Sequence, residues 1–149
     1  MVESSHSKMV ISSKTSEMSA VEEAVLNQAR AYQYPEQVLF GVRLALEEAL
    51  ANAIKHGNAG DPDRKVTVDY SVDRQRIHVA VWDEGYGFAP EQLPDPRQEE
   101  HLTQPHGRGV LLMRAYMDEV HFNERGNCVT LIKYRNEPGP GAGSGGCQS

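Results

Sequence analysis

Apolar residues follow two different periods along this 149-residue chain, and the change between them limits the folds that it can adopt. Over residues 38–54 they recur every three to four positions, which predicts an amphipathic helix. Over residues 66–81 they alternate with polar residues on either side of Asp73-Arg74-Gln75, which predicts a β-hairpin. Helices and strands in separate runs are typical of an α+β fold.

The other segments complete an order of strand, two helices, hairpin, loop, helix and hairpin. The sequence predicts strands at residues 8–13, 66–72, 77–81, 119–123 and 128–134, and helices at residues 19–34, 35–57 and 109–117. Ser19 and Glu22 fit a capping box at the start of the first helix, and Pro35 suits the first turn of the second. We therefore expect a two-layer sandwich in which helices cover one face of a mixed β-sheet.

The chain is long enough for one domain with a full core, but too short for two domains of ordinary size. We expect residues 1–7 to be flexible and residues 8–135 to form the domain. Residues 136–149 are rich in Pro, Gly and Ser, and we expect them to be disordered. Residues 88–105 carry four prolines and several charges and sustain neither period, which predicts a functional loop such as a lid.

Charge and composition exclude several classes of protein. The formal net charge of -6 and the lack of a Lys/Arg cluster argue against a general binder of nucleic acid or of anionic membranes. The N-terminus has no apolar signal segment and no apolar run is long enough to span a bilayer, so we expect a cytoplasmic protein. Of the two cysteines, Cys128 falls in a predicted strand and Cys147 in the tail, and we expect neither a disulfide nor a thiolate metal site.

A polar row accompanies the apolar stripe of the second predicted helix. Glu48, Asn52 and His56 are spaced one helical turn apart, and the apolar stripe already supplies a buried face. A carboxylate next to a carboxamide suits a magnesium-nucleotide site, because Mg²⁺ takes few ligands from protein and the rest from water and phosphates. Asn52 is then the candidate Mg²⁺ ligand and Glu48 the candidate proton acceptor. Taken alone, the row also fits a solvated Glu and a buried Asn bonded to the backbone.

The first of two glycine-containing segments, D-E-G-Y-G at residues 83–87, ends an apolar strand. Gly85 and Gly87 would let the backbone turn and approach a ligand without a Cβ clash. The Asp83 carboxylate can accept a hydrogen bond from an exocyclic amine. Alone, this pattern also fits an ordinary turn after a strand.

The second segment, H-G-R-G at residues 106–109, opens a helix. The amides of Gly107 and Gly109 would bind phosphates there, and Arg108 would neutralise their charge. Alone, a glycine-rich helix start is also a common structural cap. The chain has no G-x-x-x-x-G-K-[ST] motif, which excludes a P-loop nucleotide site.

The order and spacing of these three segments match a known ATP site. The chain resembles the GHKL superfamily of gyrase, the heat-shock chaperone, histidine kinases and mismatch-repair ATPases. The N, G1 and G2 boxes of that superfamily correspond to residues 47–57, 83–87 and 106–109, and three boxes in order are far more specific than one. The resemblance implies a Bergerat-type ATP-binding fold, with ATP and Mg²⁺ as cofactors.

The resemblance also implies roles for single residues. Glu48, rather than Glu47, would have the catalytic role, because it lies four positions before the Asn. Asp83 would select adenine over guanine. The residues implied at the ATP site are Asn52 (also the Mg²⁺ ligand), Lys55, His56, Asp83, Gly85, Gly87, Gly107, Arg108 and Gly109.

Within the superfamily, the short chain and the run G-R-G-V-L-L-M-R-A-Y-M-D-E-V at residues 107–120 resemble the bacterial anti-sigma-factor serine kinases. The resemblance covers roughly residues 8–135. It implies an ATP-dependent serine/threonine protein kinase that sequesters a sigma factor and phosphorylates an anti-sigma antagonist, in a partner-switching pathway that controls transcription. The resemblance is also compatible with a homodimer.

Two departures from the family pattern leave a second function open. The family usually has Thr after the glycine of the last hairpin, whereas Asn127 and Cys128 follow it here. The family also commonly has an Arg in the first helix near the γ-phosphate, whereas this helix has Glu22 and Glu23 in its middle and only Arg30 late. The alternative is a non-catalytic ATP-sensing module, whose nucleotide state gates its affinity for a partner. A purely structural interaction domain, which is less consistent with the three segments, would bind no nucleotide.

Overall fold

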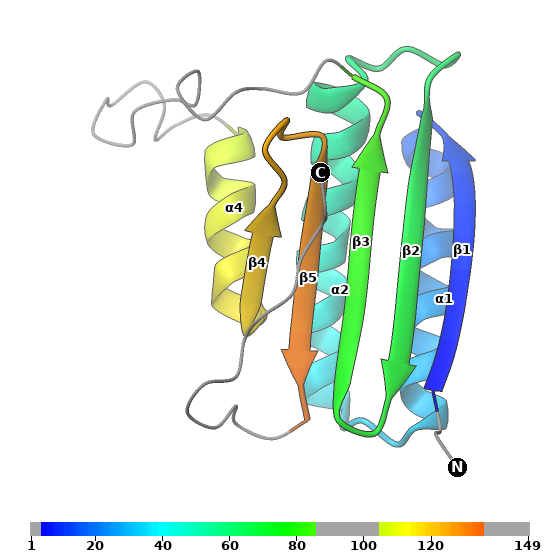
Figure 1. The fold of residues 1–149 in the computed structure, drawn as a ribbon, viewed down its shortest axis with the longest axis vertical. Coiled ribbons are helices and arrows are strands. Elements are labelled where there is room, and N and C mark those ends of the chain that lie inside the picture. The colour runs from blue at the N-terminus through cyan, green and yellow to red at the C-terminus, as the bar shows by residue number, and fades with distance from the viewer. Residues whose placement is uncertain (1–3, 86–104, 136–149) are drawn as a thin grey trace.

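The computed structural model describes residues 4–85 and 105–135, which form a sheet packed against helices (Figure 1). The elements are β1 (Ser4–Ser12), the 3-10 turn η1 (Thr15–Glu17), α1 (Met18–Ala31), α2 (Glu36–Asn52), the π-helical turn η2 (Ala53–Gly57), β2 (Lys65–Asp73), β3 (Arg76–Asp83), α4 (Pro105–Tyr116), β4 (Glu119–Phe122) and β5 (Cys128–Tyr134). The loop expected at residues 88–105, apart from Pro105, and the expected tail at residues 136–149 lie outside the described residues.

The strands form one sheet in the order β1-β2-β3-β5-β4, and α1, α2 and α4 lie behind one face of it (Figure 1). This arrangement confirms the two-layer α+β sandwich. Every described pair of neighbouring strands is antiparallel, so the sheet is antiparallel rather than mixed as expected. The reason is that α1 and α2 run in opposite directions between β1 and β2, so the chain enters β2 at the end where β1 stopped.

Alternation along β2 and β3 points one row of their side chains at the helices, as the predicted hairpin requires. Val68 and Val79 on this row are fully buried, and so are Leu46 and Leu50 of α2 in the same core. Burial of a side chain of this size stabilises the fold by roughly 1.5–3 kcal/mol. The apolar stripe of α2 is therefore held on the sheet, which fixes the direction in which its polar row points.

The first helix begins differently from the expected capping box. Because η1 precedes it, α1 begins at Met18, so Ser19 lies inside the helix and no side chain caps its start. Glu17 instead accepts hydrogen bonds from the Ser12 backbone N–H at 3.1 Å and from the Ser12 hydroxyl, which ties the helix entrance to the end of β1. Glu22, the expected capping partner, is buried, and the loss of solvent raises its pKa to about 6.

Two elements, β1 and α4, start four residues earlier than the sequence predicted. β1 pairs with β2 from Ser4 onward, so residues 4–7 extend the expected first strand. α4 begins at Pro105 rather than at Gly109, consistent with the preference of proline for the first turn of a helix. Gly107 and Gly109 therefore lie within the helix and not just before it.

Two further observations concern membrane-spanning helices and the cysteines. Within residues 4–85 and 105–135, no helix is both long enough and apolar enough to cross a membrane. Cys128, buried at the start of β5, is disulfide-bonded, which corrects the expectation that no disulfide forms; its partner lies outside the described residues. That expectation rested on the places of the two cysteines in the sequence, whereas disulfide formation depends on the distance between them in the fold.

Candidate functional site

Three parts of the chain meet at one end of the sandwich, namely the end of α2, the end of β3 and the start of α4 (Figure 1). α2 and β3 both run toward this end and α4 runs away from it. The three sequence segments that predicted a nucleotide site lie at these three termini. The fold therefore brings them to the same end of the molecule.

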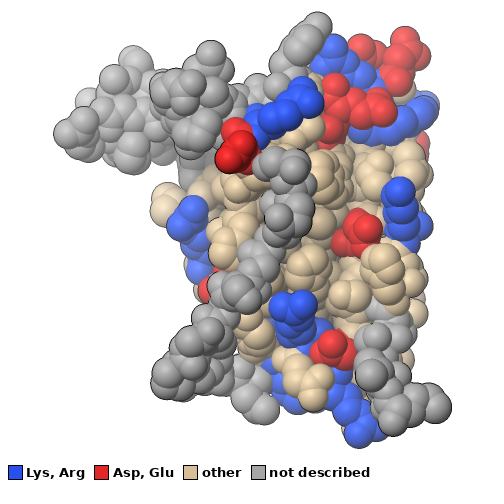
Figure 2. All heavy atoms as spheres, viewed as in Figure 1, with Lys and Arg blue, Asp and Glu red and all other residues tan. Residues whose placement is uncertain are grey.

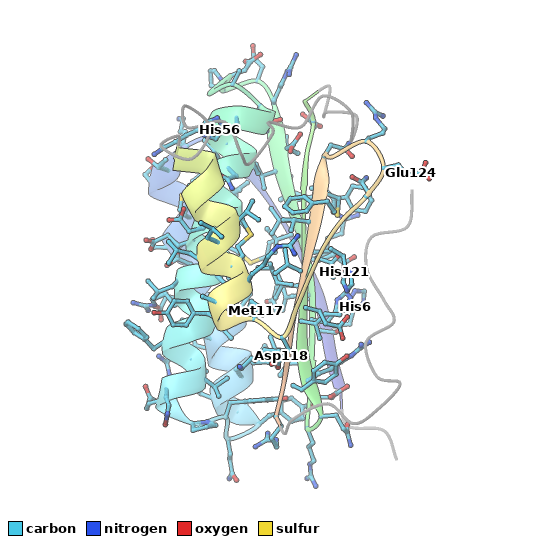
Figure 3. All side chains as sticks on the ribbon, turned by 90° about the vertical axis from the view of Figure 1, so that its left-hand side faces the viewer. His6, His56, Met117, Asp118, His121 and Glu124 are labelled. Atoms are coloured by element: carbon cyan, nitrogen blue, oxygen red, sulfur yellow. The ribbon has the colours of Figure 1, made fainter. Side chains whose placement is uncertain are left out.

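The last part of the second helix changes geometry as it reaches this end. The α-helix ends at Asn52 and continues as the π-helical turn η2, where the Asn58 N–H bonds to the Ala53 carbonyl at 2.8 Å. Such turns are rare and occur frequently at functional sites. Lys55 and His56 are exposed on this turn, and Figure 3 places His56 at the same end of the molecule as the start of α4.

The π-helical turn and the end of β3 touch through two glycines. A Cβ on Gly57 would lie 2.2 Å from Asp83 Oδ2, and a Cβ on Gly85 would lie 1.8 Å from the Gly57 carbonyl oxygen. Both distances are far below 3.0 Å, under which real Cβ contacts essentially never fall. Gly85 thus permits a close approach to the backbone of Gly57, and its predicted approach to a ligand stays a prediction.

The Asp83 carboxylate is partly buried against this contact. Its Oδ1 accepts the Gly85 N–H at 2.8 Å, whereas Oδ2 accepts no hydrogen bond from the described residues. Burial raises the pKa of Asp83 to about 6, while the Gly85 N–H and the guanidinium groups of Arg64 and Arg125 act in the opposite direction. Charged side chains of both signs gather at this end (Figure 2). Oδ2 can therefore accept a hydrogen bond from a ligand.

Glu48 and Asn52 lie on the side of α2 that faces α4. Gly41 marks this side, because a Cβ on it would lie 3.0 Å from the Tyr116 ring of α4. Glu48 and Asn52 follow Gly41 by seven and eleven positions and share its side of a helix with 3.6 residues per turn. Both are partly buried, and neither side chain forms a hydrogen bond or ion pair with the described residues. A partly buried carboxamide with no hydrogen-bond partner among residues 4–85 and 105–135 can offer its oxygen to a metal ion, so Asn52 fits Mg²⁺.

The start of α4 lies level with the end of α2. α4 has 12 residues, runs antiparallel to α2, and packs its last residue, Tyr116, on Gly41. Because each residue of a helix advances about 1.5 Å, its first residues lie beside Asn52, and the amides of Gly107 and Gly109 are near the same point. The Arg108 side chain and all of Gly87 lie outside the described residues.

Asn58 is the site residue that the sequence did not reveal. It is fully buried, and its side chain bonds to Ser13, Lys65 and Glu84, which belong to three separate segments. In the sequence it is one of several turn-forming residues between η2 and β2, and no pattern distinguishes it from its neighbours.

The turn between β4 and β5, which lacks the usual Thr, is joined directly to Asp83. Asn123 Oδ1 accepts the N–H groups of Gly126, Asn127 and Cys128 at 2.9, 3.1 and 3.2 Å. The Asn127 carbonyl in turn accepts the Asp83 N–H at 2.9 Å. The backbone of this turn therefore supports Asp83, whichever side chain follows the glycine.

Arg30, the late arginine of the first helix, lies at the opposite end of the molecule. It is close to the end of α1, and just beyond it the Tyr34 hydroxyl donates to the Asp73 carbonyl at 2.8 Å, at the turn between β2 and β3. β3 starts at this turn and ends at Asp83. The length of the sheet thus separates Arg30 from Asp83.

Within the described residues, no group of three or more His, Cys, Asp and Glu side chains is placed to hold a metal ion. A Mg²⁺ site that is completed by phosphates and water does not need such a group.

Comparison with known proteins agrees with this geometry. A family model described as the histidine kinase-like ATPase domain matches residues 11–133. Serine-protein kinase RsbW of Listeria monocytogenes serovar 1/2a is 29% identical over 103 residues, covering 64% of this chain and 66% of the relative. Anti-sigma F factor of Anoxybacillus flavithermus is 31% identical over 100 residues, covering 62% and 67%. The anti-sigma F factor of Halalkalibacterium halodurans is 34% identical over 83 residues, covering 53% and 56%.

The chain spans about two thirds of the length of the first two of these relatives. The family match confirms the resemblance to the GHKL superfamily. Since residues 11–133 include all three segments that meet at the end of the sandwich, the chain belongs to the histidine kinase-like ATPase domain family.

Proposed function

We propose that this chain is an ATP-dependent protein serine/threonine kinase and anti-sigma regulatory factor, which phosphorylates an anti-sigma antagonist in a partner-switching pathway that controls transcription. The names of its relatives support this function, since one is a serine-protein kinase and another an anti-sigma F factor. The observation that carries it is the partly buried Asp83 carboxylate, which packs on Gly57 and whose Oδ2 accepts no hydrogen bond from the part of the chain that the structure describes. The partners would be a sigma factor and its antagonist, with a second copy of this chain as a further candidate. A cytoplasmic location belongs to the same proposal.

ATP would bind with its adenine at Asp83 and its phosphates at the start of α4. The exocyclic amine of adenine would donate to the Asp83 carboxylate, whereas guanine has a carbonyl at that position and would meet a second acceptor. Gly85 and Gly87 would let the backbone lie beside the base. The residues proposed for the phosphates are Lys55, His56, Gly107, Arg108 and Gly109. Lys55 and Arg108 would supply positive charge, His56 a ring N–H, and Gly107 a free N–H in the first turn of α4. Gly109 follows Pro105 by four positions, so its N–H would bond within the helix, and it would contribute by letting the phosphates approach without a Cβ.

Phosphate transfer would take place beside Glu48 and Asn52. Asn52 would hold Mg²⁺, which supplies neutralisation of phosphate charge when it is bound. Glu48 would accept the proton of a substrate hydroxyl as that oxygen attacks the γ-phosphorus. The new oxygen–phosphorus bond forms while the bond from the γ-phosphorus to the bridging oxygen breaks, which leaves ADP and a phosphorylated Ser or Thr.

The position of Arg30 favours a second candidate, an ATP-sensing module without turnover. No arginine of α1 other than Arg30 is present to reach the γ-phosphate, and Arg30 lies at the far end of the sheet. Such a module would bind ATP through the same residues and change its affinity for a partner.

Incubation with Mg²⁺-ATP and each small antagonist-like protein encoded nearby distinguishes the two functions. A kinase would place a phosphate on one Ser or Thr of a partner, detected by mass spectrometry. Nucleotide binding without transfer to any partner would support the sensor instead.

Asp83→Asn is expected to weaken ADP binding by about ten- to a hundredfold, because it keeps the shape of the side chain but removes the charged acceptor. Isothermal titration calorimetry measures the change. Asp63→Asn, at an exposed carboxylate in the nearby connector, is the matched control and should bind ADP like the wild type. Equal wild-type affinities for ATP and GTP would contradict the adenine site.

The affinity for ADP should depend on pH in the range of the Asp83 pKa, which is about 6. Above this pH the ionised carboxylate accepts the amine, so wild-type ADP affinity should fall as pH falls through about 6 and approach that of Asp83→Asn. ADP itself titrates equally with both proteins, so the difference between the two curves reports Asp83. The free energy of unfolding should change in the opposite direction, and rise as pH falls. Because the pKa of Asp83 is raised in the folded state, its ionised form disfavours folding, and this effect disappears at low pH.

Asn52→Ala is expected to remove most of the Mg²⁺ dependence of ATP binding, because it deletes the one protein oxygen proposed as a ligand. The measurement compares ATP affinity with and without EDTA in both proteins. An unchanged Mg²⁺ requirement in Asn52→Ala would place the metal at other residues.

A further inference from the structure

Asn58 joins four segments at the end of the sandwich where the candidate site lies. Its side chain is fully buried, and both ends of the carboxamide are used. Nδ2 donates to Ser13 Oγ and to the Lys65 carbonyl, each at 2.9 Å, and Oδ1 accepts the Glu84 N–H at 2.7 Å. Its own N–H bonds to the Ala53 carbonyl in the π-helical turn. One residue thus fixes the end of α2, the end of β1, the start of β2 and the residue that follows β3.

The Oδ1 bond of Asn58 reaches the proposed adenine site. Glu84 lies between Asp83 and Gly85, so its N–H belongs to the short stretch that carries the carboxylate and the close contact. Asn58 also follows Gly57 directly, and the Asp83 carboxylate packs on Gly57. Asn58 is therefore joined to both sides of the contact, to Gly57 through the chain and to the residue after Asp83 through its carboxamide.

We propose that Asn58 is a positioning residue for adenine recognition, which holds the Glu84 N–H and so sets where the Asp83 carboxylate stands over Gly57. This inference rests on the proposed ATP site and deepens it. Because its carboxamide is fully buried and every polar atom is bonded within the protein, Asn58 acts through Asp83 and not by touching the nucleotide. Nδ2 bonds to Ser13 and Lys65, at the end of β1 and the start of β2, whereas Oδ1 bonds to Glu84, next to Asp83. The two sets of bonds can be tested separately.

Asn58→Ala, measured in the full chain, tests the role with two probes. ADP contains adenine, whereas inorganic tripolyphosphate reports only the phosphate part of the site. ADP affinity is expected to fall at least about tenfold, because the Glu84 N–H loses its acceptor and Asp83 its fixed position. Tripolyphosphate affinity should stay within about twofold of wild type.

Ser13→Ala is the matched control. It removes one partner of Nδ2 and the Ser13 bond to the Arg64 carbonyl, but it leaves the bond from Glu84 to Oδ1 in place. It should therefore lower the stability measured by denaturant unfolding and keep wild-type ADP affinity. A purely structural Asn58 would make Asn58→Ala and Ser13→Ala behave alike.

Two results would overturn the inference. One is wild-type ADP affinity in Asn58→Ala, and the other is an equal loss of ADP and tripolyphosphate affinity. If Asn58→Ala does not fold, the pair Glu84→Pro and Glu84→Ala decides, because only Glu84→Pro lacks the N–H that Oδ1 accepts. Equal ADP affinity in that pair also overturns the inference. A wild-type protein that binds neither ADP nor ATP would contradict the proposed function itself, and the inference with it.

Discussion

Glu48→Gln is expected to slow phosphate transfer by about 10²–10⁴-fold, as the loss of a general base typically does. ATP affinity should stay within about twofold of wild type, because the amide has the same shape as the carboxylate. Glu48 is partly buried one turn before Asn52 and bonds to none of the described residues, so the amide leaves no protein donor unpaired. The amide cannot accept the proton of the attacking hydroxyl. Single-turnover transfer to the partner protein measures the rate.

Glu47→Gln is the matched control for this prediction. Glu47 is the exposed neighbour of Glu48 on the side of α2 near α1, where its charge contributes to the raised pKa of Glu22. Glu47→Gln should transfer phosphate at the wild-type rate. Wild-type transfer by Glu48→Gln would mean that another group is the base. If both wild type and Glu48→Gln bind ATP and neither transfers phosphate, the ATP-sensing module takes the place of the kinase.

The hydrophobic period located most helices and strands because it reports which side of an element is buried. β5 runs from Cys128 to Tyr134 as predicted, and the hairpin of β2 and β3 turns where its polar interruption indicated. The period did not predict the direction in which β1 pairs, because alternation reports which face of a strand is buried and not the direction of the neighbouring strand. It also did not predict the π-helical turn η2, which continues the buried stripe of α2 through Ile54.

The candidate site was predictable where the chemistry needs a residue type at a fixed local spacing. Glu48 and Asn52 share one side of α2, and Asp83 ends a strand, as their spacing predicted. Asn58 was not predictable, because its role depends on contacts with residues 45 positions before it and 26 positions after it. Gly57 was expected only to end a helix, and its contact with Asp83 likewise depends on the tertiary fold.

Gly85→Ala is expected to weaken ATP binding by about a hundredfold, the upper end of the loss expected when a charged hydrogen-bond acceptor is removed, since it displaces both the Asp83 carboxylate and the backbone beside it. The added Cβ would lie 1.8 Å from the Gly57 carbonyl oxygen and 3.1 Å from Asp83 Oδ1. The main obstacle is backbone, so no change of side-chain rotamer relieves it and the residues after β3 must move. That movement also disturbs the Gly85 N–H bond to Asp83 Oδ1, which orients the carboxylate.

Gly60→Asn is the control for this prediction, because it replaces a glycine where an added Cβ meets no other atoms. Gly60 has φ +70° and nothing within 4 Å of a built Cβ, and Asn tolerates this left-handed conformation better than most residues. Gly60→Asn should therefore bind ATP like the wild type, and denaturant unfolding of both variants shows whether either has lost the fold. The added methyl group would force the backbone of Gly85 away from Gly57, so the Asp83 carboxylate could not keep its position over Gly57. Wild-type ATP affinity in a folded Gly85→Ala would therefore mean that adenine binds away from Asp83.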